Sequence, residues 1–172
     1  MTRTSTTTHY AHCPSPIGEL LVLGDDQGRV TGLYVEGEPG APEVGSGWRH
    51  DPDASRPALD QLEAYFDGRL TEFDLELAPE GTAFQRQVWA ALSEIPYAET
   101  LSYRDIAGEL GRPQSSRAVG QANGRNPISV IVPCHRVIAA DGTLGGYGWG
   151  LERKRWLLDH EARVAGRTLV SP

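Results

Sequence analysis

The sequence predicts an α/β protein made of two small domains in succession. In the first half, short apolar runs between glycine-rich turns and one amphipathic segment indicate a small sheet with a helix. In the second half helical spacing dominates, and two short helices flank a turn containing glycine and proline. Residues 78–81 (Ala-Pro-Glu-Gly) separate the two patterns. We therefore expect domains at residues 1–80 and 81–172.

A hairpin and a long loop are expected first. Residues 20–23 and 29–35 are strand-like runs on either side of the turn sequence Gly-Asp-Asp-Gln-Gly, which indicates a β-hairpin. Residues 36–53 are rich in Gly, Pro, Asp and Glu and show no periodicity. This composition predicts a loop.

A helix and a further strand complete the first half. The helix is expected from about Arg56 to Phe66, because Pro57 suits a first helical turn. Its expected buried face consists of Leu59, Leu62 and Phe66. Residues 70–77 alternate between polar and apolar side chains, which predicts a half-buried strand.

The second half is expected to be mainly helical. A helix should span residues 83–93, with Phe84, Val88, Ala91, Leu92 and Ile95 at helical spacing. Ser102 and Asp105 form a capping-box pattern that opens a helix to Leu110. A turn at residues 111–113 and a helix over 115–122 follow, and a last helix is expected over 151–162. Helix, turn and helix in this order are typical of DNA-binding domains, although such pairs are common in any α-rich domain.

Charge is divided unevenly between the two halves. The chain carries a net charge of −7, yet residues 1–81 hold 5 basic and 15 acidic residues, whereas residues 82–172 hold 11 and 8. No acidic residue lies between Glu109 and Asp141. Because DNA responds to a local surface rather than to total charge, this stretch favours a nucleic-acid partner. Four arginines lie in it: Arg112, Arg117, Arg125 and Arg136.

Composition excludes several other classes of protein. With 172 residues, 39% of them hydrophobic, the chain is long enough for a globular core. No apolar stretch approaches the roughly 18 residues of a membrane span. The first eight residues are polar and do not resemble a signal peptide, so we expect a cytoplasmic protein. Cys13 lies near three histidines, but their spacing matches no zinc signature, and we expect no metal.

The strongest chemical signal is a cysteine beside a histidine. Residues 128–132 are apolar and largely β-branched, and prolines bound them, which predicts a buried strand ending at Pro133. Cys134 and His135 would then lie at the rim of a core. A thiolate is the attacking form of cysteine, and a neighbouring base makes more of it. A free cysteine is also often a small buried apolar residue, so this pair alone leaves both interpretations open.

The wider sequence context resembles the O6-alkylguanine-DNA alkyltransferases. The resemblance is strong over about residues 82–162 and loose in the first half. It implies a ribonuclease-H-like first domain and a winged-helix-like helix-turn-helix domain that carries the active site. The motifs behind it are Ser102-Tyr103, Arg117-Ala118-Val119-Gly120, Asn126 to Ile138 (NPISVIVPCHRVI), Gly145-Gly146-Tyr147-Gly148 and Trp156 to Glu161 (WLLDHE).

The resemblance implies a catalytic role for several residues. Cys134 would accept the alkyl group, His135 would act on its thiol through a bridging water, and Glu161 would orient His135. We accordingly expect Cys134 to ionise more easily than a free thiol. Asn126 would brace the turn before the active site, and Tyr103 would crowd the target phosphate and assist protonation of the departing guanine. Taken alone, Glu161 also fits a solvated carboxylate at a helix end, and Tyr103 a buried tyrosine.

DNA contacts are implied for the second helix of the pair. Arg117 matches the residue that enters the duplex, from the minor groove, when the damaged nucleotide is flipped out. An ordinary contact between Arg117 and a phosphate is the alternative. The DNA-binding residues implied by the resemblance are Arg117, Tyr103, Ser116, Ala118 and Gly120.

The pocket for the flipped base is implied to contain Tyr147, Gly148, Trp149 and Val137. Tyr147 would form a wall, and Gly148 would let the backbone approach the base. Trp149 departs from the family, which usually has a small residue there. Its ring would narrow the pocket, stack on the base or turn outward.

These implications define an expected function and its competitors. The resemblance implies one-turnover repair of O6-alkylguanine, and we expect O4-alkylthymine as well, in double-stranded DNA by a cofactor-free, stand-alone protein. The protein is expected to be a monomer in solution, and the sequence leaves cooperative assembly on DNA open. A non-catalytic damage sensor is disfavoured because Cys134 is present. A cysteine hydrolase using Cys134, His135 and Glu161 is disfavoured by the acid-free helix-turn-helix.

Overall fold

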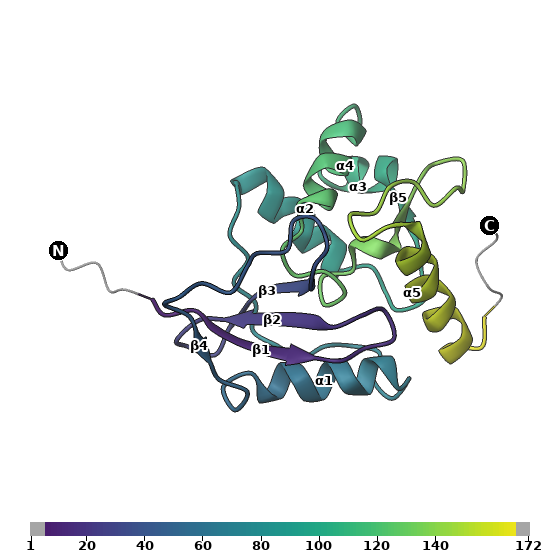
Figure 1. Ribbon diagram of the computed structural model, residues 1–172. Coiled ribbons are helices and arrows are strands. Elements are labelled where there is room, and N and C mark those ends of the chain that lie inside the picture. Colours follow the sequence, from purple (N-terminus) through teal and green to yellow (C-terminus); the bar gives the residue numbers. More distant parts are fainter. Residues whose placement is uncertain (1–5, 168–172) are drawn as a thin grey trace. The chain divides into compact units, whose positions relative to one another are not determined.

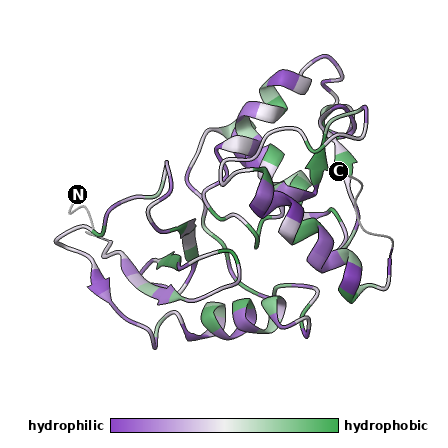
Figure 2. Cartoon of the chain, turned by 45° about the vertical axis from the view of Figure 1, so that its right-hand side comes forward, coloured by the Kyte–Doolittle hydropathy of each residue, from purple (hydrophilic) through white to green (hydrophobic). Residues whose placement is uncertain are grey.

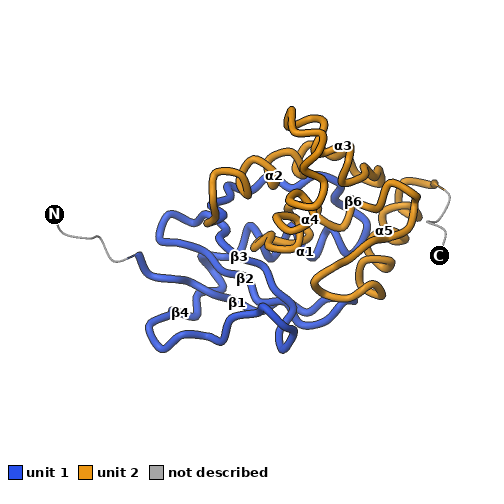
Figure 3. Tube along the Cα trace, turned by 90° about the horizontal axis from the view of Figure 1, so that it is seen from above, with its two compact units in different colours: residues 1–79 blue, residues 80–172 orange. Residues whose placement is uncertain are grey.

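The computed structural model describes residues 6–167 and divides the chain into two compact units, residues 1–79 and 80–172 (Figure 3). Residues 1–5, part of the segment tested above for a signal peptide, lie outside the described residues. Strands and helices occur in both units, which confirms the predicted α/β class. No helix among residues 6–167 is long and apolar enough to cross a membrane.

The first unit is built on a sheet. Its described strands are β1 (His9–Cys13), β2 (Leu20–Gly24), β3 (Val30–Val35) and β4 (Arg49–His50), in the order β3-β2-β1-β4. The predicted hairpin is confirmed, because β2 and β3 pair antiparallel around a turn in which Asp25 accepts the N–H groups of Gln27 and Arg29. β1 pairs antiparallel with β2 and parallel with β4.

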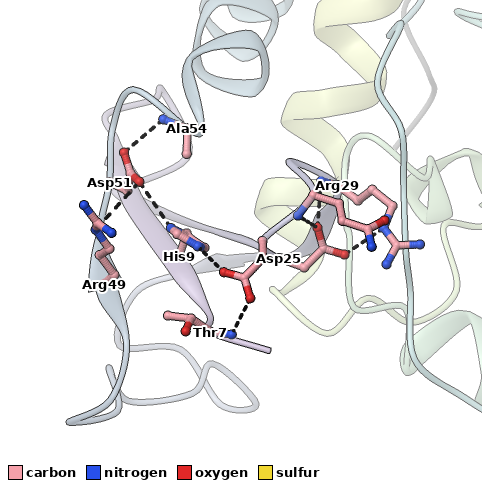
Figure 4. Close-up of polar contacts among 9 residues, drawn as sticks. Thr7, His9, Asp25, Arg29, Arg49, Asp51 and Ala54 are labelled. Atoms are coloured by element: carbon pink, nitrogen blue, oxygen red, sulfur yellow. Dashed lines mark hydrogen bonds and ion pairs between the residues drawn. The ribbon is translucent and has the colours of Figure 1, made fainter. Parts of the chain in front are cut away.

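Polar contacts hold β1 and β4 in place, and the sequence patterns had predicted neither strand. The ring nitrogens of His9 lie 2.8 Å from Asp26 Oδ1 and 3.2 Å from Asp51 Oδ2. Asp51 also accepts the N–H of Ala54 (Figure 4). The loop predicted for residues 36–53 is thus interrupted by a two-residue strand.

Helix α1 (Arg56–Phe66) has the predicted bounds and runs along one face of the sheet (Figure 1). Apolar and polar residues alternate along it (Figure 2). Its buried residues are Ala58, Leu62 and Tyr65, so the predicted face was correct only at Leu62. The strand predicted over residues 70–77 was wrong except for one bridge at Leu77. The side chain of Gln61 on α1 donates to the carbonyl and accepts the N–H of Asp74, which removes these groups from strand pairing.

The second unit contains four α-helices in its described part: α2 (Ala83–Ser93), α3 (Tyr103–Glu109), α4 (Ser116–Gly124) and α5 (Leu151–Val164). The predicted helix-turn-helix is confirmed as α3 and α4, and the predicted Ser102–Asp105 capping box opens α3. Thr82 and Gln85 form a second capping box at the start of α2. Two short parallel strands, β5 (Leu101–Ser102) and β6 (Val137–Ile138), lie beside the helices.

The core of this unit fixes α4, the second helix of the pair. Val88, Trp89 and Leu92 form the buried face of α2. The indole N–H of Trp89 donates to the carbonyl of Ala122 on α4 at 2.8 Å. Trp89 therefore anchors the predicted DNA-reading helix by a directional contact as well as by packing.

The buried strand predicted over residues 128–132 was wrong, although the segment is buried as expected. It forms a tight turn in which the Val132 N–H donates to the Ile128 carbonyl at 2.9 Å. Val130 has φ +74°, a conformation that costs a β-branched residue about 1–3 kcal/mol. The side chain of Asn126 holds the turn, because it accepts the N–H of Ile128 and donates to the carbonyl of Val132.

Candidate active site

Cys134 begins a short 3-10 helix (Cys134–Arg136) directly after the Asn126 turn. Only 3% of the residue is exposed. Its N–H donates to the Val132 carbonyl, and its own carbonyl accepts from Asn123 Nδ2 on α4 at 3.3 Å. The cysteine is therefore held by the main chain of the turn and by a side chain of the predicted DNA-reading helix.

Next to it, Glu161 of α5 binds His135 and Arg136 at once. Glu161 Oε2 lies 2.7 Å from His135 Nε2, and Arg136 donates to both carboxylate oxygens at 2.8 and 3.1 Å. All three side chains are buried. Burial alone would raise the pKa of Glu161, but the contacts with His135 and Arg136 outweigh it and hold that pKa far below its usual range. Glu161 is therefore ionised at neutral pH.

The ionised carboxylate fixes the tautomer of His135. Burial lowers the pKa of His135 despite the nearby Glu161, so the ring is neutral at neutral pH. A carboxylate only accepts hydrogen bonds, so the single ring proton lies on Nε2. Nδ1 then carries a free lone pair, and it has no hydrogen-bond partner among the described residues. This nitrogen is a base ready to take a proton.

The expectation that Cys134 ionises more easily than a free thiol was wrong. Burial raises its pKa, and this effect exceeds the lowering by Asn126, Ser129, Lys154 and Tyr147. Desolvation disfavours the charged thiolate more than the polar neighbours favour it. At neutral pH the side chain is therefore a thiol, and a base must remove its proton before the sulfur can act as a nucleophile.

Lys154 of α5 is a site residue that the sequence analysis missed. Its side chain is fully buried, and Nζ donates to the carbonyls of Val137 (2.7 Å), Leu144 and Gly146 (3.1 Å). Burial lowers its pKa to about 8. Lys154 and Glu161 are seven residues apart, so they lie on the same face of α5 as Leu157 and Leu158. Two charged residues within one apolar helix face were the sequence signal that could have identified Lys154 as a buried site residue.

Tyr103 connects the helix pair to the loop before α5. A Cβ at position 145 would lie 3.1 Å from the Tyr103 hydroxyl, and Gly145 has φ +70°, so this position requires glycine. Lys154 Nζ lies 6.0 Å from the Tyr103 ring centroid. Burial and the nearby Cys134 raise the pKa of Tyr103, which keeps its hydroxyl protonated.

The other predicted DNA-binding residues lie on α4. Arg117 and Ala118 are exposed, whereas Ser116 and Gly120 are half-buried. Tyr103, Ser116, Arg117, Gly120 and Gln121 together line an open, largely apolar groove. Four of the five predicted contact residues therefore share this groove, whereas Ala118 lines a different one, and the exposed Arg117 can reach outward.

The predicted pocket residues surround Cys134 only in part. Val137 is buried in β6, and the Tyr147 hydroxyl is close enough to the thiol to lower its pKa. Trp149 is 8% exposed and packs edge-on against Tyr147, with ring centroids 5.9 Å apart. Its ring therefore does not turn outward. Gly148 is exposed.

No group of three His, Cys, Asp or Glu side chains within residues 6–167 is placed to hold a metal ion.

The fold and the site together define a class: a two-unit protein with a helix-turn-helix and a buried cysteine beside a carboxylate-bound histidine. The chain belongs to the 6-O-methylguanine DNA methyltransferase family, which confirms the resemblance. Residues 8–79 match its ribonuclease-like domain, and residues 83–163 match its DNA binding domain.

Similar proteins come from both bacteria and archaea. The chain is 53% identical over 162 residues to a methylated-DNA–protein-cysteine methyltransferase of Mycobacterium tuberculosis, covering 94% of this chain and 97% of the relative. It is 52% identical over 153 residues to a protein of that name from Methanosarcina acetivorans, covering 89% and 97%. The crystal structure of Mycobacterium tuberculosis OGT in complex with DNA has a TM-score of 0.84 and 51% identity, over 91% of this chain and 94% of that chain.

Proposed function

We propose that this chain repairs DNA by direct reversal, transferring the alkyl group of O6-alkylguanine to Cys134 in one turnover without a cofactor. Family membership and the methyltransferase relatives support the reaction. The single observation that assigns it to particular residues is the buried Cys134 thiol followed by His135, whose Nε2 is bound by Glu161 and whose Nδ1 is unpartnered among the described residues.

The proposed step exchanges a proton for an alkyl group. Nδ1 of His135 takes the thiol proton through a bridging water, and the sulfur of Cys134 attacks the alkyl carbon. A sulfur–carbon bond forms while the bond from that carbon to O6 breaks, and its electron pair goes to the guanine. Tyr103, which stays protonated, assists protonation of the leaving base. The product is a thioether, which has no easy leaving group, so the protein is consumed.

The alkylated base must reach a thiol that is buried in the protein. We propose that the target nucleotide is flipped out of the duplex, at a cost of a few kcal/mol. Helix α4 would lie in the minor groove, with Arg117 occupying the space in the stack and Ser116, Ala118 and Gly120 against the backbone. The exposure of Arg117 supports this arrangement, and the solved complex of the Mycobacterium tuberculosis relative with DNA supports DNA as the partner. O4-alkylthymine would be accepted as well.

Asn126, Val137, Tyr147, Gly148 and Trp149 complete the proposed site. Asn126 holds the turn that presents Cys134, and the other four residues would surround the flipped base. We further propose that the protein acts as a cytoplasmic monomer.

The test is mass spectrometry of the intact protein after mixing with an oligonucleotide that contains O6-methylguanine. The expected result is a gain of one methyl group per molecule, located by peptide mapping to Cys134. Binding without any gain in mass would identify a damage sensor. Repeated release of a small product from an unmodified protein would identify a hydrolase. Either outcome would overturn the proposal.

A further inference from the structure

Ser129 lies inside the tight turn that presents Cys134. It is 8% exposed, and Asn126 and the positive φ of Val130 fix the backbone around it. A serine hydroxyl buried in a rigid turn needs a nearby polar partner, because an unpaired buried hydroxyl is costly. Its partner is the sulfur of Cys134, the atom proposed to accept the alkyl group.

The Cys134 thiol donates a hydrogen bond to the Ser129 hydroxyl, with Sγ and Oγ 3.8 Å apart. A hydroxyl is both a donor and an acceptor, and its proton rotates to suit its partner. A serine beside a thiol therefore accepts from the neutral form and can donate to the ionised form without moving its heavy atoms.

We propose that Ser129 is a catalytic residue that switches from acceptor to donor as Cys134 loses its proton and so stabilises the attacking thiolate. This role rests on the proposed alkyl transfer. When His135 removes the S–H proton through water, the hydrogen bond from sulfur to oxygen is lost. The Ser129 O–H turns toward the sulfur and holds the negative charge until the sulfur–carbon bond forms. The hydroxyl then turns away, and it neither gains nor loses a proton overall.

Ser129 acts within a set of groups that all influence the same sulfur. The Ser129 contact lowers the pKa of Cys134, in the direction opposite to burial. The neighbours differ in kind: Lys154 is a cation on α5, while the hydroxyls of Tyr147 and Tyr103 remain protonated. His135, Arg136 and Glu161 form their own bonded cluster. Ser129 is the neutral hydroxyl that the turn itself supplies, at a fixed distance from the sulfur.

The experiment titrates the thiolate without DNA and then measures transfer. The ultraviolet absorbance of the thiolate is followed against pH in Ser129→Ala, in the wild type and in Cys134→Ala as the blank. We expect the midpoint of Cys134 in Ser129→Ala to rise by about one pH unit, because the thiolate loses a hydrogen bond to its charge. Methyl transfer at pH 7 should then slow about tenfold, because one pKa unit is a tenfold change in the thiolate fraction. The deficit in transfer should shrink as pH rises. The control is Ser55→Ala, which removes a buried serine hydroxyl from the first unit and should change neither value.

Two outcomes contradict the role. An unchanged thiolate midpoint in folded Ser129→Ala would remove Ser129 from the chemistry. A transfer deficit that is equal at every pH would mean that Ser129 only shapes the turn. If Ser129→Ala does not fold, Ser129→Thr and Ser129→Val replace it, because their side chains have the same shape and differ only in the hydroxyl. The midpoint of the Cys134 titration should then be higher in Ser129→Val than in Ser129→Thr. The titration needs no substrate, so it still reports on Ser129 if the wild type gains no methyl group and the proposed function fails.

Discussion

The two cysteines of this chain, one in each unit, have similar burial and opposite surroundings. Cys13 on β1 is 6% exposed and Cys134 is 3% exposed. Burial raises the pKa of both thiols. Around Cys13 the charged neighbours are Glu19 and Glu63, which raise its pKa further, and its thiol donates to the Pro14 carbonyl at 3.6 Å. Around Cys134 the polar groups named above act in the other direction and lower its pKa.

This difference separates a structural cysteine from a candidate nucleophile. A carbonyl and two carboxylates oppose a thiolate, so Cys13 behaves as a small apolar residue of the sheet. Ser129, Asn126, Lys154 and Tyr147 favour a thiolate at Cys134, although they do not overcome burial. A neutral thiol is a weak nucleophile, so in the proposed reaction these neighbours act on the thiolate once His135 has removed the proton.

The largest expected effect comes from removing the Cys134 thiol. Cys134→Ala should abolish alkyl transfer and leave binding to alkylated DNA nearly intact, because affinity comes from phosphates and the flipped base. Cys13→Ala is the matched control and should transfer at the wild-type rate. Mass spectrometry and a binding titration on one oligonucleotide measure both properties. Methyl transfer that persists in Cys134→Ala, with the label on Cys13, would reverse the assignment of the two cysteines.

Glu161→Gln is expected to have the next largest effect. The amide no longer fixes the His135 tautomer, so transfer should slow by about 100-fold, within the range of general-base catalysis. It also leaves Arg136 as an unpaired buried cation, which should destabilise the protein by about 3–5 kcal/mol. Glu152→Gln, on the exposed first turn of α5, is the control. A wild-type transfer rate in folded Glu161→Gln would leave Glu161 with a structural role alone.

The same variant changes the acid stability. The pKa of Glu161 in the folded protein lies below its unfolded value of about 4.5, so its stabilising contribution is complete above that pH and is lost as pH falls below it. Urea unfolding between pH 7 and pH 3 should therefore show a smaller acid loss in Glu161→Gln than in the wild type.

Lys154→Met should slow transfer by about tenfold at pH 7, because the buried cation lowers the pKa of Cys134. A rise of one unit in that pKa costs the thiolate about 1.4 kcal/mol, which is a tenfold change in its population. The wild-type lysine itself loses its charge as pH rises through about 8. The difference between wild type and variant should therefore narrow above that pH. Single-turnover rates from pH 6 to pH 9 test this, with Arg155→Met as control. A rate ratio that stays constant with pH would mean that Lys154 only holds the carbonyls of Val137, Leu144 and Gly146.

Local chemistry explains which parts of the fold the sequence predicted. The β2–β3 hairpin, α1 and the Ser102 capping box depend on residues a few positions apart, and all three were predicted correctly. The strand predicted over residues 128–132 failed because a single side chain, that of Asn126, closes the segment into a turn. Lys154 was missed because a lysine on a helix is usually solvated. The ionisation of Cys134 was predicted in the wrong direction because sequence adjacency to His135 does not reveal burial.

Arg117→Ala tests access to Cys134 rather than its surroundings. Because an inserted arginine offsets unstacking, repair of duplex DNA should slow by about tenfold, whereas reaction with free O6-alkylguanine base should be almost unchanged. The measurement compares the rate of Arg117→Ala with that of the wild type on each of the two substrates. Arg125→Ala, an exposed arginine just after α4, is the matched control. Equal losses on both substrates would mean that Arg117 supports the fold or the pocket.

The smallest expected effect concerns Trp149, at a position where the resemblance implied a small residue. Its buried ring packs against Tyr147, which in turn faces the sulfur of Cys134. If the ring stacks on the flipped base, it adds about 1–3 kcal/mol of binding, as aromatic side chains do for single-stranded bases. The same ring takes up volume that a benzyl group needs. The two effects oppose each other for large adducts, whereas for methyl only the stacking gain applies.

Trp149→Gly should therefore leave methyl transfer similar or slower and make benzyl transfer about two- to fivefold faster, a size discrimination at the low end for an apolar pocket. The ratio of the two rates is the measured quantity, because it cancels any general loss of stability from the cavity that the missing ring leaves. Trp48→Gly, in the first unit, should leave this ratio unchanged. If Trp149→Gly changes both rates by the same factor, the ring supports Tyr147 from behind and does not line the pocket in front of Cys134.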